Sequence, residues 1–374
     1  MKYLIAKNIV LKQILKKYWR NRVSALLHAI FGGLAIRMAV AVVTFALVFG
    51  LWSLDSHSDD EPVIALKEIA HPTGIDHWPA KKMVLFADFG GSIYSMQEDG
   101  TRVAKLMVIK ERDCARVTRV RVDEVRSRLW VMSAAGICVY NLQSLHLIRH
   151  LPVGDMSRYR LANGLTDLAL DAQGNAYAID TGIDPIVYQI ESATLAVAMW
   201  NKLTPLRDAG VYSPRHFPLN ALAVTPQGKH LLYVNAYAGT LHVMNTIGKT
   251  HSTVSMSHKL YAVNALVAAP STMSAGGIDL YAVSAGNNSV TVVAVDSELK
   301  TARTRAFATK HLDQPLAAVM LRGTVFITNS QLLRYPEIVN EDRDALRPFS
   351  IGRMSRKYFA EQAANPILDS VLRP

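Results

Sequence analysis

The first 54 residues contain no aspartate or glutamate, although they carry eight lysines and arginines. All 30 acidic residues therefore lie beyond residue 54, together with 33 of the 41 basic ones, so the rest of the chain has a balance of only +3. The net charge of +11 is concentrated in the N-terminal segment, and a nearly neutral main part offers no basic surface for nucleic acid. The sequence predicts no nucleic-acid partner.

Motifs of several enzyme classes are also missing. None of the twelve histidines lies in an H-E-x-x-H or H-x-H pattern, which leaves a zinc-hydrolase site without support. No G-x-S-x-G nucleophile elbow occurs, and the P-loop-like ending at 247–250 has Val243 where the first glycine must stand. The motifs leave open whether the protein is an enzyme.

One hydrophobic run is long enough to cross a membrane. Residues 38–54 are almost entirely apolar, and with 31–36 they reach the roughly 20 residues that a membrane helix needs. All the basic residues of this region precede the end of the run, and the first acid, Asp55, follows it directly. The positive-inside rule then predicts an uncleaved signal anchor at 31–54, with the N-terminus in the cytoplasm. A cleaved signal peptide is the alternative, but the basic region is long for one and no A-x-A-like site follows.

The segments on either side of this run are polar. Apolar residues fall near helical spacing among the lysines of 1–30, which suggests a basic amphipathic helix on the inner leaflet; a charged cytoplasmic tail that only fixes topology is the alternative. Residues 55–61, DSHSDDE, form a polar linker. The domain after the linker is therefore expected on the periplasmic or extracellular side, attached to the membrane by one helix.

From residue 62 onward the chain repeats. Six similar β-type runs begin 44 to 55 residues apart: LFAD at 85, LWVM at 129, AYAI at 176, LLYV at 231, LYAV at 280 and VFIT at 325. Each is followed by a turn and a further run: SIYSM, ICVYNL, PIVYQI, TLHVM, SVTVVAV and QLLRY. A period near 45 residues with three or four strands per unit is typical of a β-propeller, whose blades bury one another's faces.

The repeat predicts an all-β, six-bladed propeller at 62–353, followed by a helix or loose tail at 354–374. The run 62–70 is expected to complete the last blade and close the ring. Aromatic residues recur in the repeated runs and are expected to pack between blades: Trp130, Tyr177, Tyr233 and Tyr281.

The chain has only two cysteines, Cys114 and Cys138, both in the part expected outside the cytoplasm. An oxidising compartment permits a disulfide, and the two residues fall at the same end of one predicted sheet. Two buried free thiols are the alternative.

Three consecutive repeats resemble blades of the yellow/major royal jelly protein family: VRVDEVRSRLWVM…ICVYNL, LTDLALDAQGNAYAIDTG…PIVYQI and ALAVTPQGKHLLYVNAYAGTLHVM. The ending TNSQLLRYPEIVNEDRDALRPF is similar to the end of that family, and the resemblance covers about 114–353. It implies an exported six-bladed propeller related to the gluconolactonase and senescence-marker group, often with a small ligand in the central tunnel. Both cysteines have counterparts in the family, which favours the disulfide.

The chain departs from the family at tunnel-facing positions. The family's Asn-Asp pair reads Thr166-Asp167 here, and its Asp-Gly reads Asn220-Ala221. Its terminal Ser-Asn pair is inverted to Asn329-Ser330, and its Trp-Pro-Asp segment survives as Leu312-Asp313. The ligand specificity of the family is therefore not carried over.

Residues at the starts of innermost propeller strands point into the channel mouth. By position, the predicted ligand-binding residues are Asp123, Asp167, Asn220, Asn264 and Asp313. The related metal-dependent lactonases hold a divalent cation with a Glu, two Asn and an Asp, and the corresponding oxygen donors here would be Asn163, Asn220, Asn264 and Asp313. Residues 71–96 contain no glutamate to complete that set. Alternatively, Asp123 and Asp167 only cap turns.

Two functions follow as hypotheses. The first is a membrane-anchored, exported propeller that binds a small ligand or a partner protein at its channel without catalysis. The second is a lactonase- or tautomerase-like enzyme that depends on Ca²⁺ or another divalent cation. The state of the channel distinguishes them.

Overall fold

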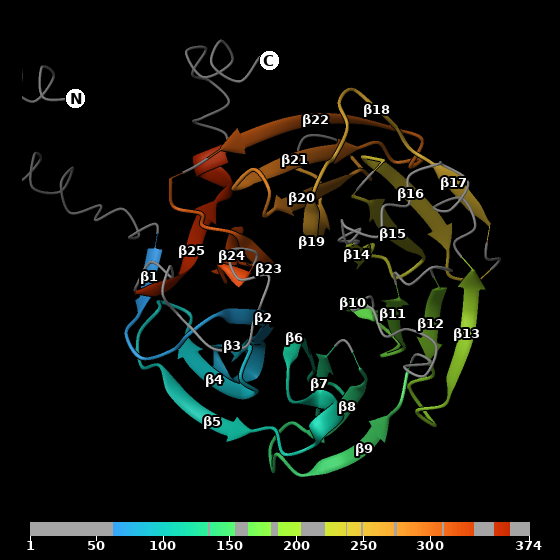
Figure 1. Cartoon of the computed structure of the whole chain (residues 1–374). Coiled ribbons are helices and arrows are strands. Elements are labelled where there is room, and N and C mark those ends of the chain that lie inside the picture. Colours follow the sequence, from blue (N-terminus) through green and yellow to red (C-terminus); the bar gives the residue numbers. More distant parts are fainter. Residues whose placement is uncertain are drawn as a thin grey trace, which may run out of the picture. The chain divides into compact units, whose positions relative to one another are not determined.

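Six β-sheets are arranged as blades around a central axis (Figure 1). The computed structural model describes residues 63–133, 135–153, 164–180, 186–202, 221–236, 238–247, 250–272, 275–308, 310–332 and 348–359. All of them belong to the unit Pro62–Pro374. The predicted all-β, six-bladed propeller is confirmed.

Each blade is a sheet whose strands follow one another from the central axis outward. Blade 1 is β2 (Pro72–Trp78), β3 (Met83–Asp88), β4 (Ser92–Gln97) and β5 (Ala104–Val108). Blade 2 is β6 (Val117–Asp123), β7 (Arg128–Ser133), β8 (Ile137–Asn141) and β9 (Leu147–Leu151). Blade 3 is β10 (Leu165–Leu170), β11 (Ala176–Asp180), β12 (Ile186–Ile190) and β13 (Val197–Lys202).

The other three blades follow the same plan. Blade 4 is β14 (Ala221–Val224), β15 (His230–Asn235), β16 (Thr240–Asn245) and β17 (His251–Thr253). Blade 5 is β19 (Val263–Pro270), β20 (Ile278–Ser284), β21 (Ser289–Val295) and β22 (Thr301–Ala308), with β18 (Ser255–Met256) added in parallel at its outer edge. Blade 6 is β23 (Pro315–Leu321), β24 (Thr324–Asn329), β25 (Phe349–Ser355) and β1 (Val63–Leu66).

The ring is closed by the first strand of the described chain. β1 pairs antiparallel with β25, so that Leu66 lies opposite Phe349. This outermost strand covers the exposed edge of the last blade, as expected for the run 62–70, and it ties the two ends of the propeller together. One helical turn at 356–359 follows β25, and its Phe359 packs against Tyr281 and Phe307 of blade 5.

The six repeated runs of the sequence are the second strands of the six blades, as predicted. The prediction for the last of the further runs was wrong: Gln331 and Leu332 of QLLRY lie outside any strand, and β25 supplies the third strand of blade 6. In FSIGRMS, Phe349 and Ile351 are buried and the intervening Ser350 is partly exposed, an alternation that shifts by one residue at the buried Gly352.

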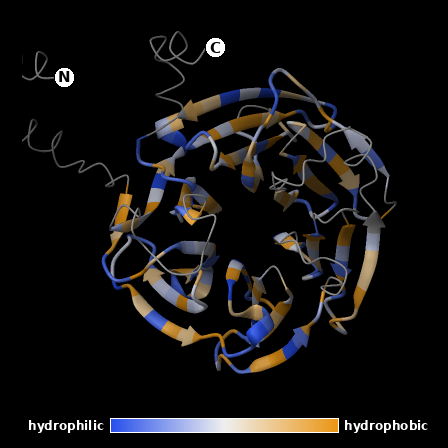
Figure 2. Ribbon diagram, viewed as in Figure 1, coloured by the Kyte–Doolittle hydropathy of each residue, from blue (hydrophilic) through white to orange (hydrophobic). Residues whose placement is uncertain are grey.

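Aromatic side chains fill the spaces between neighbouring blades. Trp130, Tyr177 and Tyr281 are almost completely buried and each packs against the following blade. Tyr233 is also buried but stands one residue out of step, so it packs back against blade 3. The strands that carry these aromatics are buried on both faces, so a side chain on either face packs against a neighbouring blade, and hydrophobic residues occur in all six blades (Figure 2). The prediction that these aromatic residues pack between blades is confirmed. The prediction that they occupy equivalent positions is wrong for Tyr233.

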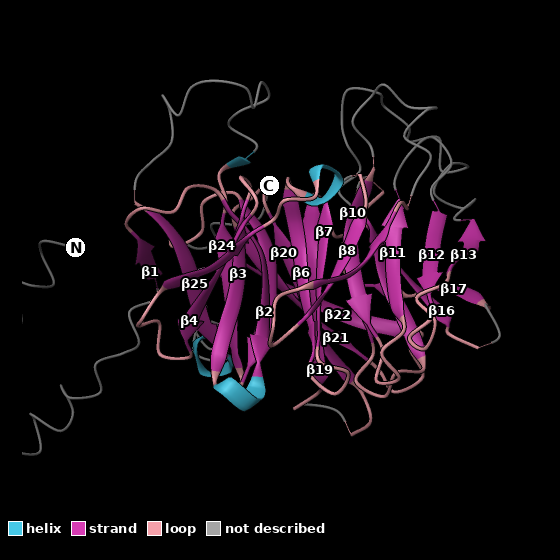
Figure 3. Ribbon diagram, turned by 90° about the horizontal axis from the view of Figure 1, so that it is seen from below, coloured by secondary structure: helices cyan, strands magenta, loops and turns pink. Residues whose placement is uncertain are grey.

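The innermost strands all begin at one face of the ring, the start face, and finish at the opposite one, the end face. The 3₁₀ helix η3 (Arg112–Cys114) precedes β6 at the start face, and η2 (Pro79–Lys81) follows β2 at the end face. Figure 3 shows these helical turns on opposite sides of the ring.

The predicted anchor at 31–54, the segment 1–30 and the linker 55–61 lie outside the described residues. Within the part of the chain that is described, no helix has the length and hydrophobicity to span a membrane.

Candidate functional site: the central channel

A β-bulge interrupts the innermost strand near its start in five of the blades. The register shifts between Val117 and Arg119 in β6, and between Leu165 and Asp167 in β10; β2, β19 and β23 shift in the same region. A bulge turns the next side chain in a new direction. It places Arg119 and Asp167 at equivalent positions of neighbouring blades.

Arg119 and Asp167 form a buried ion pair. The Nε atom of Arg119 donates to Oδ1 of Asp167 at 2.7 Å, and the two side chains are 3 % and 0 % exposed. The other oxygen, Oδ2, accepts the backbone N–H of Leu222 in blade 4 at 2.9 Å, and Oδ1 also accepts the N–H of Leu168. Both oxygens of this carboxylate are therefore occupied by protein donors.

The guanidinium of Arg119 extends across the ring. It donates to the carbonyl of Thr118 in its own strand at 2.8 Å and to the carbonyl of Asn264 in β19 at 2.6 Å. Blades 2 and 5 lie on opposite sides of the axis (Figure 1). Arg119 thus bridges the channel, and with Asp167 it links blades 2, 3, 4 and 5.

A second arginine on the same strand extends the network to blade 1. Arg121 donates to the carbonyl of Ile75 at 3.3 Å, and its guanidinium lies 3.8 Å from Oδ1 of Asp167. Asp76 of β2 accepts the N–H of Val122 at 2.6 Å. Burial raises the pKa of Asp76, while Arg121 acts in the opposite direction. Two arginines and two aspartates thus alternate within the channel.

The side-chain amide of Asn264, near the start of β19, has one donor without a partner among the described residues. Its Oδ1 accepts the N–H of Ala285 at 3.0 Å, which fixes the orientation of the amide. Its Nδ2 is buried and has no hydrogen-bond partner in the described part of the chain, although the residue is only 1 % exposed. An amide turned this way offers N–H groups, whereas a metal ion needs the oxygen.

The remaining predicted site residues lie at the end face, at the start face or outside the described residues. Asp123 is the last residue of β6, not the first, and lies at the end face about 13 Å along the strand from the level of Asp167. There it accepts the N–H of Arg126 and pairs with its guanidinium at 3.2 Å, which makes it a turn cap. Asp313 leads into β23 at the start face, where its N–H donates to Oδ1 of Asn329 at 3.1 Å. Asn163 and Asn220 are not among the described residues.

The donor set within the described residues does not fit a hard cation. Asp167 has both oxygens bonded and a guanidinium at 2.7 Å, and Asn264 turns its oxygen into its own blade. A hard cation such as Ca²⁺ takes six to eight oxygen ligands, several of them from carboxylates. Around Asp167 and Asn264, the described side chains instead present arginine and amide N–H groups.

The predicted disulfide between Cys114 and Cys138 is confirmed, with a Cα–Cα distance of 6.2 Å. It joins the segment before β6 to the start of β8. Both cysteines are fully buried. The hydroxyl of Tyr140 donates to Glu111 beside the bridge, and burial together with this bond raises the pKa of Tyr140.

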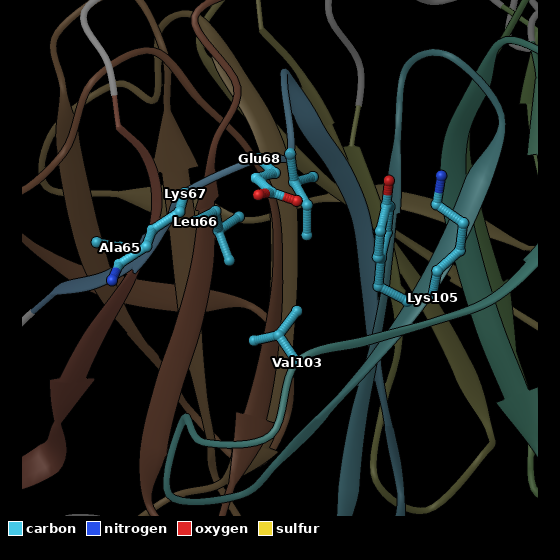
Figure 4. A pocket seen from close by; sticks show the side chains of 8 residues that line it. Ala65, Leu66, Lys67, Glu68, Val103 and Lys105 are labelled. Carbon is cyan, nitrogen blue, oxygen red and sulfur yellow. The ribbon is translucent and has the colours of Figure 1, made fainter.

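A separate hollow lies on the outside of the ring, where blade 6 meets blade 1. It has a volume of about 480 Å³, and its wall includes Leu66, Ile69 and Tyr94, with Lys67 and Lys105 at its edge (Figure 4). The ammonium of Lys105 lies 5.5 Å from the centre of the Tyr94 ring. Sequence reasoning did not find this hollow, because its walls come from strands that are distant in the chain.

Sequence reasoning also missed Arg119, Arg121 and Asp76. The signal was present in VTRVRVD, where arginines alternate with valines along an innermost strand. Charged residues at every second position of such a strand face the channel. Their partners, however, lie 48 and 145 residues away from Arg119 and leave no trace in the local pattern.

Comparison with known proteins supports the fold. No family model and no curated protein matches the sequence. Similar solved structures include the major allergen Mala s 1 of Malassezia sympodialis (TM-score 0.58, 10% identity, 79% of this chain and 95% of that one). A luciferin-regenerating enzyme is also similar (0.54, 11%, 78% and 94%), as is the calcium-binding protein regucalcin of Agrobacterium tumefaciens (0.52, 10%, 79% and 91%). At this identity the likeness shows the six-bladed propeller alone, and membership of the yellow family stays a prediction.

Proposed function

We propose that this chain is a membrane-anchored, exported propeller that binds a small ligand or a partner protein at the start-face end of its channel, without metal-dependent catalysis. The observation that carries the proposal is the bond of Arg119 to Asp167 and Asn264, which commits the channel carboxylate to a structural role. A lactonase-like enzyme would need free carboxylate oxygens in the channel to bind its cation. The ligand class that fits best bears acceptor oxygens, because Asn264 offers an unpartnered donor within the described residues.

A thermal-shift screen of the full chain tests this function. Small carboxylic acids are compared with their neutral amides, and calcium chloride and a chelator are tested alongside. A carboxylic acid is expected to raise the melting temperature of the wild type. Asn264→Ala should abolish that rise, because the amide donor is lost, whereas Asn287→Ala should retain it, because Asn287 is an exposed residue of the same blade.

Calcium and chelator are expected to leave the melting temperature unchanged. A calcium-dependent rise that disappears in Asn264→Ala or Asp313→Ala would overturn the proposal in favour of the enzyme. If no carboxylic acid stabilises the wild type, the proposed ligand class is wrong.

The anchor is supported by the charge pattern of the first 55 residues, with basic residues up to Arg37 and the first acid at Asp55. A phosphatase that is active only outside the cytoplasm, fused after Asp60, is expected to be active in intact cells. The same reporter fused after Ser24, before the apolar run, should be inactive. Activity after Ser24 combined with inactivity after Asp60 would contradict the proposed orientation.

A further inference from the structure

The disulfide of blade 2 has a histidine as its immediate neighbour. Cys138 in β8 lies directly opposite His150 in β9, so both side chains leave the same face of the sheet. The sulfur atoms of Cys114 and Cys138 and a ring nitrogen of His150 all lie within 4.8 Å of one another. Two sulfurs and one imidazole nitrogen at this spacing are the donor types that zinc prefers.

One nitrogen of this imidazole has no hydrogen bond. Nε2 of His150 is buried and has no hydrogen-bond partner among the described residues, and a carboxylate oxygen, Oδ2 of Asp113, lies 3.7 Å away. A side chain at position 136 would bring its Cβ within 3.2 Å of that nitrogen, and the residue there is Gly136. Buried polar atoms normally have partners, so an unpartnered nitrogen on the ring next to two sulfurs calls for an explanation.

We propose that reduction of the Cys114–Cys138 disulfide converts this cluster into a Zn²⁺ site, with His150 as the third ligand and Asp113 as the fourth. Zinc binds thiolate, imidazole and carboxylate in tetrahedral geometry at about 2.0–2.3 Å. The sulfurs must separate to about 3.8 Å for such geometry. Cysteines with Cα atoms 6.2 Å apart reach that separation by side-chain rotation.

The surrounding bonds hold the site together after reduction. The hydroxyl of Tyr140 donates to the Glu111 carboxylate, and the hydroxyl of Ser133 donates to the Asp113 carbonyl. These contacts tie the segment that carries Cys114 to β8 and β7 without the disulfide. Zinc and the disulfide are thus alternative cross-links for the same two segments.

The chemistry balances with a dithiol as reductant. The dithiol transfers two electrons and two protons to the disulfide, becomes a disulfide itself, and leaves two thiols on the protein. Zinc then displaces the two thiol protons, which pass to solvent, and binds the thiolates together with neutral His150 and the Asp113 carboxylate. Metal uptake therefore depends on the redox state of the protein.

Titration of the reduced, full chain with Co²⁺, followed by competition with Zn²⁺, tests the proposal. One equivalent of cobalt should give the absorption of tetrahedral cobalt–thiolate, and the oxidised chain should give none. His150→Gln should weaken binding at least about tenfold, since a ligand is lost. His146→Gln, which alters an exposed histidine of the same hairpin, should bind as the wild type does.

Zinc is also expected to raise the melting temperature of the reduced chain and not of the oxidised chain or of the Cys114→Ala/Cys138→Ala variant. If the reduced chain unfolds, addition of zinc must restore its folding transition. The proposal is overturned when no thiolate absorption develops, when His150→Gln binds as tightly as His146→Gln, or when zinc does not stabilise the reduced wild type.

Discussion

Replacement of Asp167 by alanine is expected to lower the free energy of unfolding by about 3–5 kcal/mol. The change leaves the Arg119 guanidinium buried without its counter-charge, and it removes the acceptor of the Leu222 N–H in the next blade. In the interior of the ring, the guanidinium then has no carboxylate to balance its charge, and the Leu222 N–H has lost its hydrogen-bond acceptor. Urea unfolding of the full chain, followed by circular dichroism, measures the loss.

Asp123→Ala is the matched control, because it removes an aspartate from a neighbouring innermost strand. Asp123 caps a turn with Arg126 at the end face, and its loss should cost only about 1 kcal/mol. If the two variants lose equal stability, the channel network is not a principal support of the ring.

Removal of the disulfide in Cys114→Ala/Cys138→Ala is expected to lower the free energy of unfolding by about 3.5 kcal/mol. The bridge closes a loop with a sequence separation of 24 residues. Without it, the unfolded chain has a higher conformational entropy, which favours unfolding. Alanine is chosen because both positions are completely buried.

The urea midpoint of the double variant measures this effect, and wild-type protein in the presence of a reductant and a chelator should behave in the same way. In the unfolded, unreduced wild type, a thiol reagent should modify neither cysteine. A double variant that unfolds at the wild-type midpoint, or cysteines that react before reduction, would contradict the prediction.

Much of the fold could be predicted from the sequence because a propeller repeats its pattern. The runs at 85, 129, 176, 231, 280 and 325 are each a short, mainly apolar stretch followed by a turn rich in Gly, Asn or Ser, and each forms a second strand. The pairing of β1 with blade 6 could be predicted because the outer edge of the last blade would otherwise be exposed. The third strand of blade 6 was missed because QLLRY has the expected spacing while FSIGRMS, the strand itself, follows an insertion.

The channel could be predicted only in part. Position along the strand correctly brought Asp167 and Asn264 to the start of their strands, but it could not show what those groups bind. Arg119 bonds the Asp167 carboxylate and the backbone carbonyl of Asn264 at once, across blades that are far apart in the chain. The pattern at Asp123 was ambiguous because an aspartate at a strand end and one at a strand start share the same local signature of a polar residue next to a valine run.

The central claim is that the Asp167 carboxylate pairs with Arg119 and does not bind a cation. A double-mutant cycle of Arg119→Met and Asp167→Leu, measured with and without millimolar calcium, tests it most directly. The predicted result is a coupling free energy of about 3 kcal/mol that calcium does not change. A coupling below about 0.5 kcal/mol, or a calcium-dependent stabilisation that the wild type shows and Asp167→Leu lacks, would contradict it.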